Sequence, residues 1–213
     1  PWQDSEPSIS NAVSGIRTIA FTSTRSRSVP SDLIAHGIYI TDDSIWTSGK
    51  PNPTRLIQDS SFNSYDQSMP AISPDGTKVI FASSKGGGGK LELWLYNRTN
   101  DTAIQLTINS YDDRDPRFSP DGTKVVFCSE RGGSRDIWIM NADGTNQLKL
   151  TTDTIAGEFY PSISSDGNKI IYISNSGVAG GNNVGNINVM DIDGSNNVNG
   201  LTTGGKDAYP SMK

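Results

Sequence analysis

Short apolar runs separated by polar turns dominate the chain, and three of these runs share one pattern. The runs KVIFA, KVVFC and KIIYI follow the tetrapeptides SPDG, SPDG and SSDG at residues 73–76, 119–122 and 164–167. Proline presets φ at the first central position of a tight turn, and glycine accepts the positive φ that follows. We therefore expect each tetrapeptide to close a hairpin into a strand whose two faces are both covered.

The same unit recurs along most of the chain. The proline upstream of each turn stands at Pro70, Pro116 and Pro161 and returns at Pro210, which gives a repeat of 45 to 49 residues. A third strand is expected in LELWLYN, DIWIMN and NINVMD, with a poorer copy in GIYIT, and a fourth strand ends near Leu-Thr. Repeats of about 40–45 residues with four strands are typical of propeller blades. No long stretch has helical periodicity, so we predict an all-β β-propeller of four-stranded antiparallel blades.

The unit boundaries predict how the ring closes. We expect a single domain over 1–213, with units at about 16–66, 67–112, 113–157 and 158–206. Residues 207–213, DAYPSMK, read as one more opening strand, which we expect to complete the first blade beside 16–21 and close a four-bladed, monomeric ring. The segment EPSIS at 6–10 offers an alternative, because it also reads as an opening strand. In that case 207–213 is surplus, and the chain is a fragment or half of a ring made by two chains.

The composition of the chain excludes some classes of binding partner. A net charge of −5 and a pI near 4.8 provide no basic surface for nucleic acid or anionic membranes. No apolar run approaches the roughly 20 residues that span a bilayer, and the sequence begins at Pro1 without a charged and apolar leader. One cysteine excludes an internal disulfide, and the repeat register predicts that Cys128 is a buried structural residue rather than a nucleophile.

Several motifs that imitate catalytic or metal sites fail on inspection. GGGGK at 86–90 lacks the first glycine and the Ser or Thr of a phosphate loop. NADG at 141–144 and DIDG at 191–194 lack the twelfth-position carboxylate of a calcium loop, so we interpret them as hairpins. The nucleophile motif GxSxG is absent. His36 is the sole histidine, which excludes multi-histidine metal sites and predicts a solvated rather than catalytic role.

The units resemble the TolB-type propeller repeat, whose signature is Pro, two residues, SPDG and an apolar run ending in an aromatic residue. The resemblance extends from about residue 16 to 213, with three good copies of the motif. It implies a propeller that ends on the first strand of a blade, as DAYPSMK does, and a periplasmic or extracellular location. The chain departs from TolB itself, which has six blades and an additional α/β domain, because it has material for four blades.

The expected strand order places the insertions, and hence a binding site, on one face. Loops into the first strand and between the second and third strands emerge together, whereas the short hairpins emerge on the opposite, structural face. The long connections are 25–36 and 175–185. We expect one polar residue of each repeat to lie at the mouth of the central channel of the propeller. It stands three positions before the repeated proline and is Gln67, Asp113, Glu158 or Asp207.

Clustered carboxylates raise one another's pKa unless a cation or a basic partner neutralises them. We therefore consider two interpretations, a ring that holds a cation or docks a partner, and separate solvated acids. Tyr160, Tyr209 and Met69 would add apolar surface at the mouth, and Arg131 and Arg135 would be rim contacts.

The functional prediction is a non-enzymatic protein-interaction module with no required cofactor, although calcium is a candidate. The alternative is a ligand-binding or enzymatic propeller that acts on a polysaccharide or a peptide through the same carboxylates.

Overall fold

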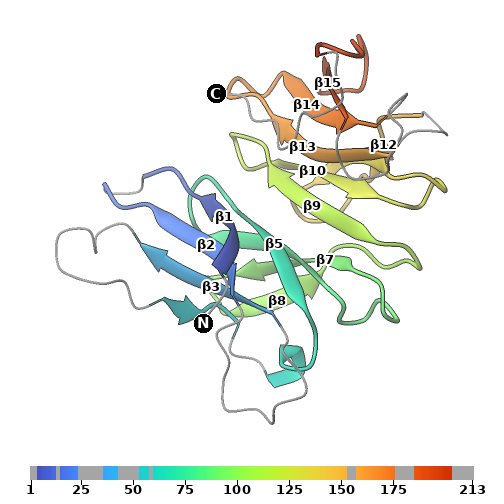
Figure 1. Ribbon diagram of the computed structural model, residues 1–213. Helices are drawn as coiled ribbons and strands as arrows, with labels where there is room; N and C mark the ends of the chain where they lie inside the picture. Colours follow the sequence, from blue (N-terminus) through green and yellow to red (C-terminus); the bar gives the residue numbers. More distant parts are fainter. Residues whose placement is uncertain are drawn as a thin grey trace. The chain divides into compact units, whose positions relative to one another are not determined.

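The computed structural model describes residues 4–12, 15–23, 36–42, 53–57, 60–152, 157–175 and 185–202. Regular structure in these ranges is β-strand, apart from the 3-10 turn η2 at Ser60–Phe62. The chain divides into two compact units, Pro1–Ser110 and Tyr111–Lys213, and each unit contains two antiparallel sheets (Figure 1). The prediction of an all-β fold is confirmed. Within the described ranges no helix is long and apolar enough to cross a membrane.

The first unit holds two four-stranded sheets whose strands follow one another in sequence order. The strands of the first sheet are β1 (Asp4–Ile9), β2 (Thr18–Ser23), β3 (Gly37–Asp42) and β4 (Thr54–Arg55). The strands of the second sheet are β5 (Gln67–Ile72), β6 (Lys78–Ser83), β7 (Glu92–Asn97) and β8 (Thr102–Gln105). This sequential antiparallel order is that of a propeller blade.

The second unit repeats the pattern. Its first sheet is formed by β9 (Asp113–Phe118), β10 (Lys124–Ser129), β11 (Asp136–Asn141) and β12 (Leu148–Lys149). The second sheet is formed by β13 (Glu158–Ile163), β14 (Lys169–Ser174) and β15 (Asn186–Asp191). A bridge between Val189 and Val198 takes the place of its fourth strand. These four antiparallel sheets confirm the predicted β-propeller of four blades.

The second strand of each blade is buried on both faces, as its continuous apolar sequence predicts. In β6 the side chains of Val79, Ile80, Phe81 and Ala82 are fully buried. Each unit has a core between its two sheets: residues of β2, β3, β6 and β7 pack together in the first unit, and residues of β10, β11, β14 and β15 pack together in the second. Burial of these apolar side chains is the main force that holds neighbouring blades together.

The hairpin turns have the predicted geometry and are reinforced by side chains. At 119–124 the Lys124 N–H donates to Ser119 Oγ at 2.9 Å, and the Ser119 hydroxyl donates to Asp121 Oδ1 at 2.5 Å. Gly122 has φ of 72°, a left-handed conformation that glycine adopts without steric cost. The turns at 73–78 and 164–169 have the same serine–aspartate hydrogen bonds. The hydrogen bond from Ser119 is the largest cause that lowers the pKa of Asp121, as the one from Ser73 is for Asp75.

The opening strand of the first blade differs from our expectation. We expected 207–213 beside Ile16 to Phe21, but the structure places β1 there, paired with β2 from Asp4↔Ser23 to Ile9↔Ile19. Because β3 occupies the other edge of β2, no place remains for another strand beside β2. Residues 207–213 themselves lie outside the described residues. The alternative in which EPSIS forms an opening strand is therefore confirmed.

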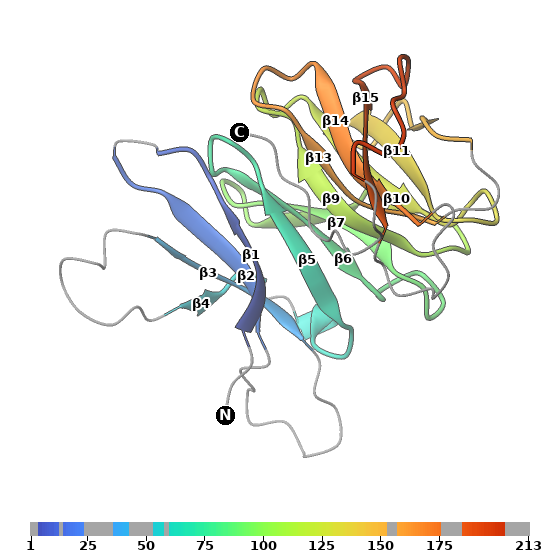
Figure 2. The ribbon, with the colours of Figure 1, turned by 45° about the horizontal axis from the view of Figure 1, so that its top comes forward.

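Side chains of β1 also join the two blades of the first unit. These contacts explain why β1 lies between β2 and β5. Glu6 Oε2 accepts hydrogen bonds from the Thr22 hydroxyl at 2.7 Å and from the Met69 N–H at 2.8 Å. Ser8 Oγ accepts from the Ile72 N–H at 3.0 Å. Two backbone donors of β5 are thus satisfied by side chains of β1, and β1 and β5 lie side by side in both ribbon views (Figures 1 and 2).

Candidate functional site

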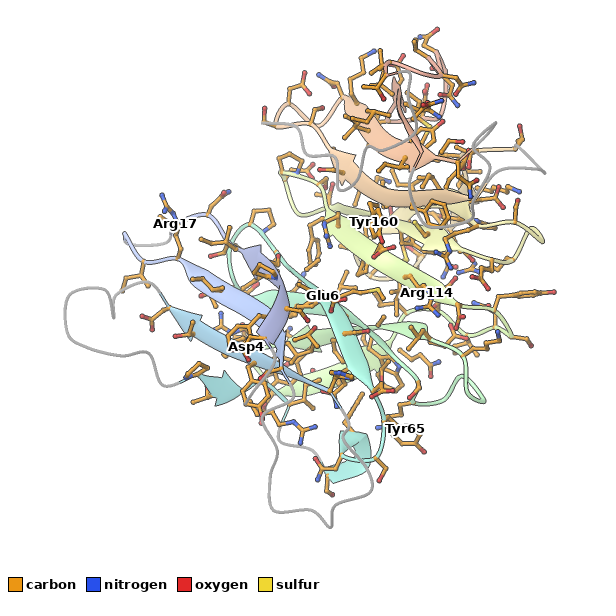
Figure 3. All side chains as sticks on the ribbon, viewed as in Figure 1. Asp4, Glu6, Arg17, Tyr65, Arg114 and Tyr160 are labelled. Atoms are coloured by element: carbon orange, nitrogen blue, oxygen red, sulfur yellow. The ribbon has the colours of Figure 1, made fainter. Side chains whose placement is uncertain are left out.

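A bulge with a strained residue recurs in the first strand of every blade. The third residue of β1, β5, β9 and β13 has φ of 53°, a left-handed conformation that costs a residue with a side chain about 1–2 kcal/mol. These residues are Glu6, Met69, Asp115 and Tyr160. In each strand the register with the second strand shifts at the bulge. Bulges redirect side chains and are common beside functional sites (Figure 3 labels Glu6 and Tyr160).

Three of our four candidates for the channel mouth are the first residues of β5, β9 and β13, and the structure buries all three. Gln67 and Asp113 are fully buried, and Glu158 is 3% exposed. The interpretation of separate solvated acids is therefore wrong for these positions. Gln67 belongs to the first unit, whereas Asp113 and Glu158 belong to the second. Asp207 and Tyr209 lie outside the described residues, so their part in the site stays a prediction.

Asp113 has a cation within its own blade. Arg131 Nη2 lies 2.9 Å from Asp113 Oδ2, and the Arg131 guanidinium lies 4.7 Å from the Trp138 ring centroid. A guanidinium suits this place because its planar face stacks on an aromatic ring while its edge donates to a carboxylate. The second unit therefore supplies from its own chain the positive charge that the carboxylate pattern led us to expect from a bound cation or a basic partner.

Arg135 and Glu158 connect the two blades of the second unit. The Glu158 N–H donates to the Arg135 carbonyl at 2.8 Å. Arg135 Nη2 lies 2.8 Å from Glu130 Oε1, and its guanidinium lies 4.8 Å from the ring centroid of Phe159. In the first unit the Gln67 N–H likewise donates to the His36 carbonyl, at 3.1 Å. Arg131 and Arg135 thus have structural contacts, and their predicted role at a rim remains untested.

Sequence reasoning missed a second polar position at the same end of each blade. The first residue of the third strand is Glu92 in β7, Asp136 in β11 and Asn186 in β15. Each pairs with the serine that ends the second strand. Glu92 accepts hydrogen bonds from the Thr107 hydroxyl and the Asn109 N–H, and Asp136 Oδ2 lies 2.8 Å from Lys149 Nζ. The signal in the sequence was the polar residue that precedes the apolar residues of each of these third strands.

The last blade has a cavity where the two preceding blades have a tryptophan. The third residue of the third strand is Trp94 in β7, Trp138 in β11 and Asn188 in β15. Trp94 and Trp138 are stacked with Lys85 and Arg131, respectively. Beside Asn188 there is a cavity of about 360 Å³. Its lining includes Glu158, three hydroxyl residues and the four asparagines Asn186, Asn188, Asn197 and Asn199.

Cys128 is buried and His36 is partly exposed, as we predicted. Cys128 is fully buried in β10, and burial raises the pKa of its thiol well above the usual value, so the thiol stays protonated and is a poor nucleophile. The His36 side chain is 46% exposed, and its Nδ1 lies 3.3 Å from Asp66 Oδ1. Among the described residues no group of three or more His, Cys, Asp or Glu side chains could hold a metal ion.

Comparisons with known proteins agree with this architecture. A structure from Agrobacterium tumefaciens assigned as TolB is 21% identical, with a TM-score of 0.69 over 92% of this chain and 65% of that one. TolB from Acinetobacter baumannii is 20% identical, with a TM-score of 0.57 over 98% and 57%. An oligogalacturonate lyase from Vibrio parahaemolyticus is 15% identical, with a TM-score of 0.56 over 84% and 49%. The chain therefore spans less than two thirds of the length of these proteins.

The sequence itself identifies the family. A comparison with curated protein sequences found no match. The model of the TolB β-propeller domain, by contrast, matches residues 53–213, which is most of the chain. The repeated turns, the sequential blades and this match lead to one conclusion: the chain belongs to the TolB β-propeller domain family.

Proposed function

We propose that this chain is a non-enzymatic protein-interaction module in which the neighbouring first strands of a unit present a contact surface to a partner protein. The observation that carries the proposal is the repeated bulge. The same strained backbone geometry carries four different side chains, of which Glu6 is exposed, Met69 and Tyr160 are half-buried, and Asp115 is buried. Catalysis requires particular groups in a fixed arrangement, whereas a contact surface needs a rigid backbone that tolerates different side chains.

The ion pairs of the second unit support binding rather than hydrolysis. Cleavage of a glycosidic bond uses two carboxyl groups, one of which must donate a proton. Asp113 and Asp136 are buried and lie within 2.9 Å of Arg131 and Lys149, and Glu130 lies within 2.8 Å of Arg135. Each of these carboxylates is engaged by a cation of its own blade, which favours a structural role for it.

The family and the composition support the rest of the proposal. Membership of the TolB β-propeller family favours a periplasmic or extracellular location, and the acidic composition disfavours nucleic acid and anionic membranes as partners. We expect no required cofactor. The monomer that we predicted rested on ring closure by residues 207–213, and light scattering coupled to size exclusion tests it against a ring made by two chains. Calorimetry with calcium chloride tests calcium as the candidate ligand that the sequence suggested.

Site-specific photocrosslinking tests the proposed surface. Tyr160→p-benzoylphenylalanine keeps an aromatic side chain in the bulge of β13, and Lys124→p-benzoylphenylalanine places the same probe at the exposed start of β10, beside a hairpin turn. In a cell-envelope or secreted extract of the source organism, we expect position 160 to label one discrete protein that position 124 does not label. Equal labelling from both positions would contradict the proposal.

A further inference from the structure

From the cavity beside Asn188 we infer a second binding site, independent of the partner surface, that takes a neutral saccharide. Its volume of about 360 Å³ lies in the range of small-molecule sites, about 300–1,000 Å³. Thr151 and Thr152, which follow the fourth strand of one blade, and residues of β13 to β15 all line it. The whole cavity therefore belongs to the second unit.

The cavity is specified by the sequence of the last blade. In β11 Trp138 fills the equivalent position and is stacked with Arg131, and in β7 Trp94 is stacked with Lys85. In β15 the smaller Asn188 stands there. Replacement of a tryptophan by a shorter polar residue leaves space in an otherwise close-packed blade.

The lining presents both hydrogen-bond donors and acceptors. Asn188 Oδ1 accepts from the Gly200 N–H at 2.7 Å, which orients the amide so that its NH₂ group remains as a donor. Asn186 Oδ1 is buried and accepts no hydrogen bond from the described residues. A buried acceptor without a donor is destabilising, so a ligand hydroxyl that donates to Asn186 Oδ1 would be stabilising.

The chemistry of the lining selects the ligand class. Amides, hydroxyls and one carboxylate match a molecule with many hydroxyl groups, each of which both donates and accepts. The described lining residues include no Lys or Arg, which disfavours acidic sugars and other anions. A calcium ion takes six to eight oxygen ligands at about 2.3–2.6 Å, and a cavity of about 360 Å³ is far larger than such a cage.

The same lining indicates binding without cleavage. Glu158 is the one carboxylate among the described lining residues, whereas glycoside hydrolysis uses a pair. The site is thus distinct in chemistry from a hydrolytic or lytic one. Bound saccharide should be released unchanged.

Saturation-transfer NMR with the full chain tests the inference. The probes are glucose, galactose and N-acetylglucosamine as neutral sugars, galacturonate as an acidic sugar, glucosamine as a basic one, and calcium chloride alone. We expect saturation transfer to at least one neutral sugar, little to galacturonate, and no competition by calcium. Binding confined to galacturonate, glucosamine or calcium, or no binding of any neutral sugar, would overturn the inference.

Two variants locate the binding. Asn188→Trp restores the residue of the neighbouring blades and should reduce the affinity for the neutral sugar at least about tenfold, because it fills the cavity. Asn186→Leu removes the amide group but keeps a side chain of similar size. It is the test variant if Asn188→Trp does not fold. Asn11→Ala, in the first unit, is the matched control and should bind like the wild type. Unchanged binding in a folded Asn188→Trp or Asn186→Leu variant would refute the site. Neither outcome bears on the partner protein, which is detected by crosslinking at position 160.

Discussion

At the residue scale, the buried carboxylates at the strand ends are balanced by groups of their own blade. Arg131 faces Asp113, Lys149 faces Asp136, and Glu92 is held by a hydroxyl and a backbone N–H. Asp113 and Asp136 are therefore paired with cations, and Glu92 is stabilised by hydrogen bonds, before any partner binds. Removing one member of such an ion pair leaves a buried charge without its counter-charge. This lowers the stability of the fold more than replacing both members by apolar residues would.

Asp113→Asn should therefore destabilise the protein strongly. The Asp113 side chain is fully buried and that of Arg131 is 19% exposed, so we expect a loss of about 3–5 kcal/mol in the free energy of unfolding. Glu130→Gln is the matched control, because its pair with Arg135 is 31% and 21% exposed and should contribute about 1 kcal/mol or less. Urea denaturation measures both. Equal effects would mean that Arg131 does not compensate Asp113.

The aspartates of the hairpin turns predict a dependence of stability on pH. The Ser119 and Ser73 hydroxyls are the largest causes that lower the pKa of Asp121 and Asp75 below the usual value of 3.8. Since the folded pKa is lower than the unfolded one, each turn contributes stability above about pH 4, and this contribution is lost as the pH falls through the folded pKa.

Ser119→Ala removes the main donor to Asp121, so the acid-induced loss of stability should become shallower than in the wild type. The measurement is the free energy of unfolding as a function of pH, because Ser119 also accepts from the Lys124 N–H and its loss lowers stability at every pH. Asp121→Asn, which removes the titrating group, should flatten the profile to a similar extent. An unchanged slope in both variants would contradict this account of the turn.

At the element scale, the turn and the bulge differ in how far sequence predicts them. The hairpins were predictable because proline, aspartate and glycine each have a local conformational preference. The bulges were not, because Glu6, Met69, Asp115 and Tyr160 share no preference for positive φ. Their conformation is imposed by the sheet around them. The pair of Asp113 and Arg131 was also missed, since it joins residues 18 positions apart across a loop.

Strain at the bulge can be measured by comparing two substitutions at one position. Tyr160→Gly and Tyr160→Ala remove the same ring, but only glycine adopts φ of 53° freely. The glycine variant should be the more stable of the two by about 1 kcal/mol. At Tyr111, which is exposed and is not among the residues with positive φ, alanine should equal or exceed glycine. The same ranking at both positions would show that the bulge carries no strain.

At the scale of the whole molecule, each unit is built from two blades whose first strands are neighbours. The position of β1 was open from sequence, because EPSIS and DAYPSMK have similar patterns and pattern alone does not choose between them. The hydrogen bonds that Glu6 and Ser8 accept from backbone N–H groups of β5 decide the question for β1. The repeat, the strand order and the buried second strands were all predictable from periodicity.

Truncation separates the two opening strands. Deletion of residues 1–9 removes β1, exposes the edge of β2 and leaves two backbone donors of β5 without their side-chain acceptors, so we expect aggregation or loss of cooperative melting. Deletion of 207–213 leaves the pairing of β1 with β2 in place and should preserve the melting of the first blade. Scanning calorimetry of both truncations is the test. The reverse order of effects would contradict the assignment of β1.

The affinity for the crosslinked partner protein tests the central claim, that the first strands present the contact surface. Met69→Ala in β5 and Tyr160→Ala in β13 change bulge side chains, whereas Lys124→Ala and Lys169→Ala change the hairpin ends of β10 and β14. By calorimetric titration of folded variants, at least one bulge variant should bind about tenfold more weakly, or about 1.4 kcal/mol, and the hairpin variants should bind like the wild type. Weaker binding confined to the hairpin variants would contradict the claim.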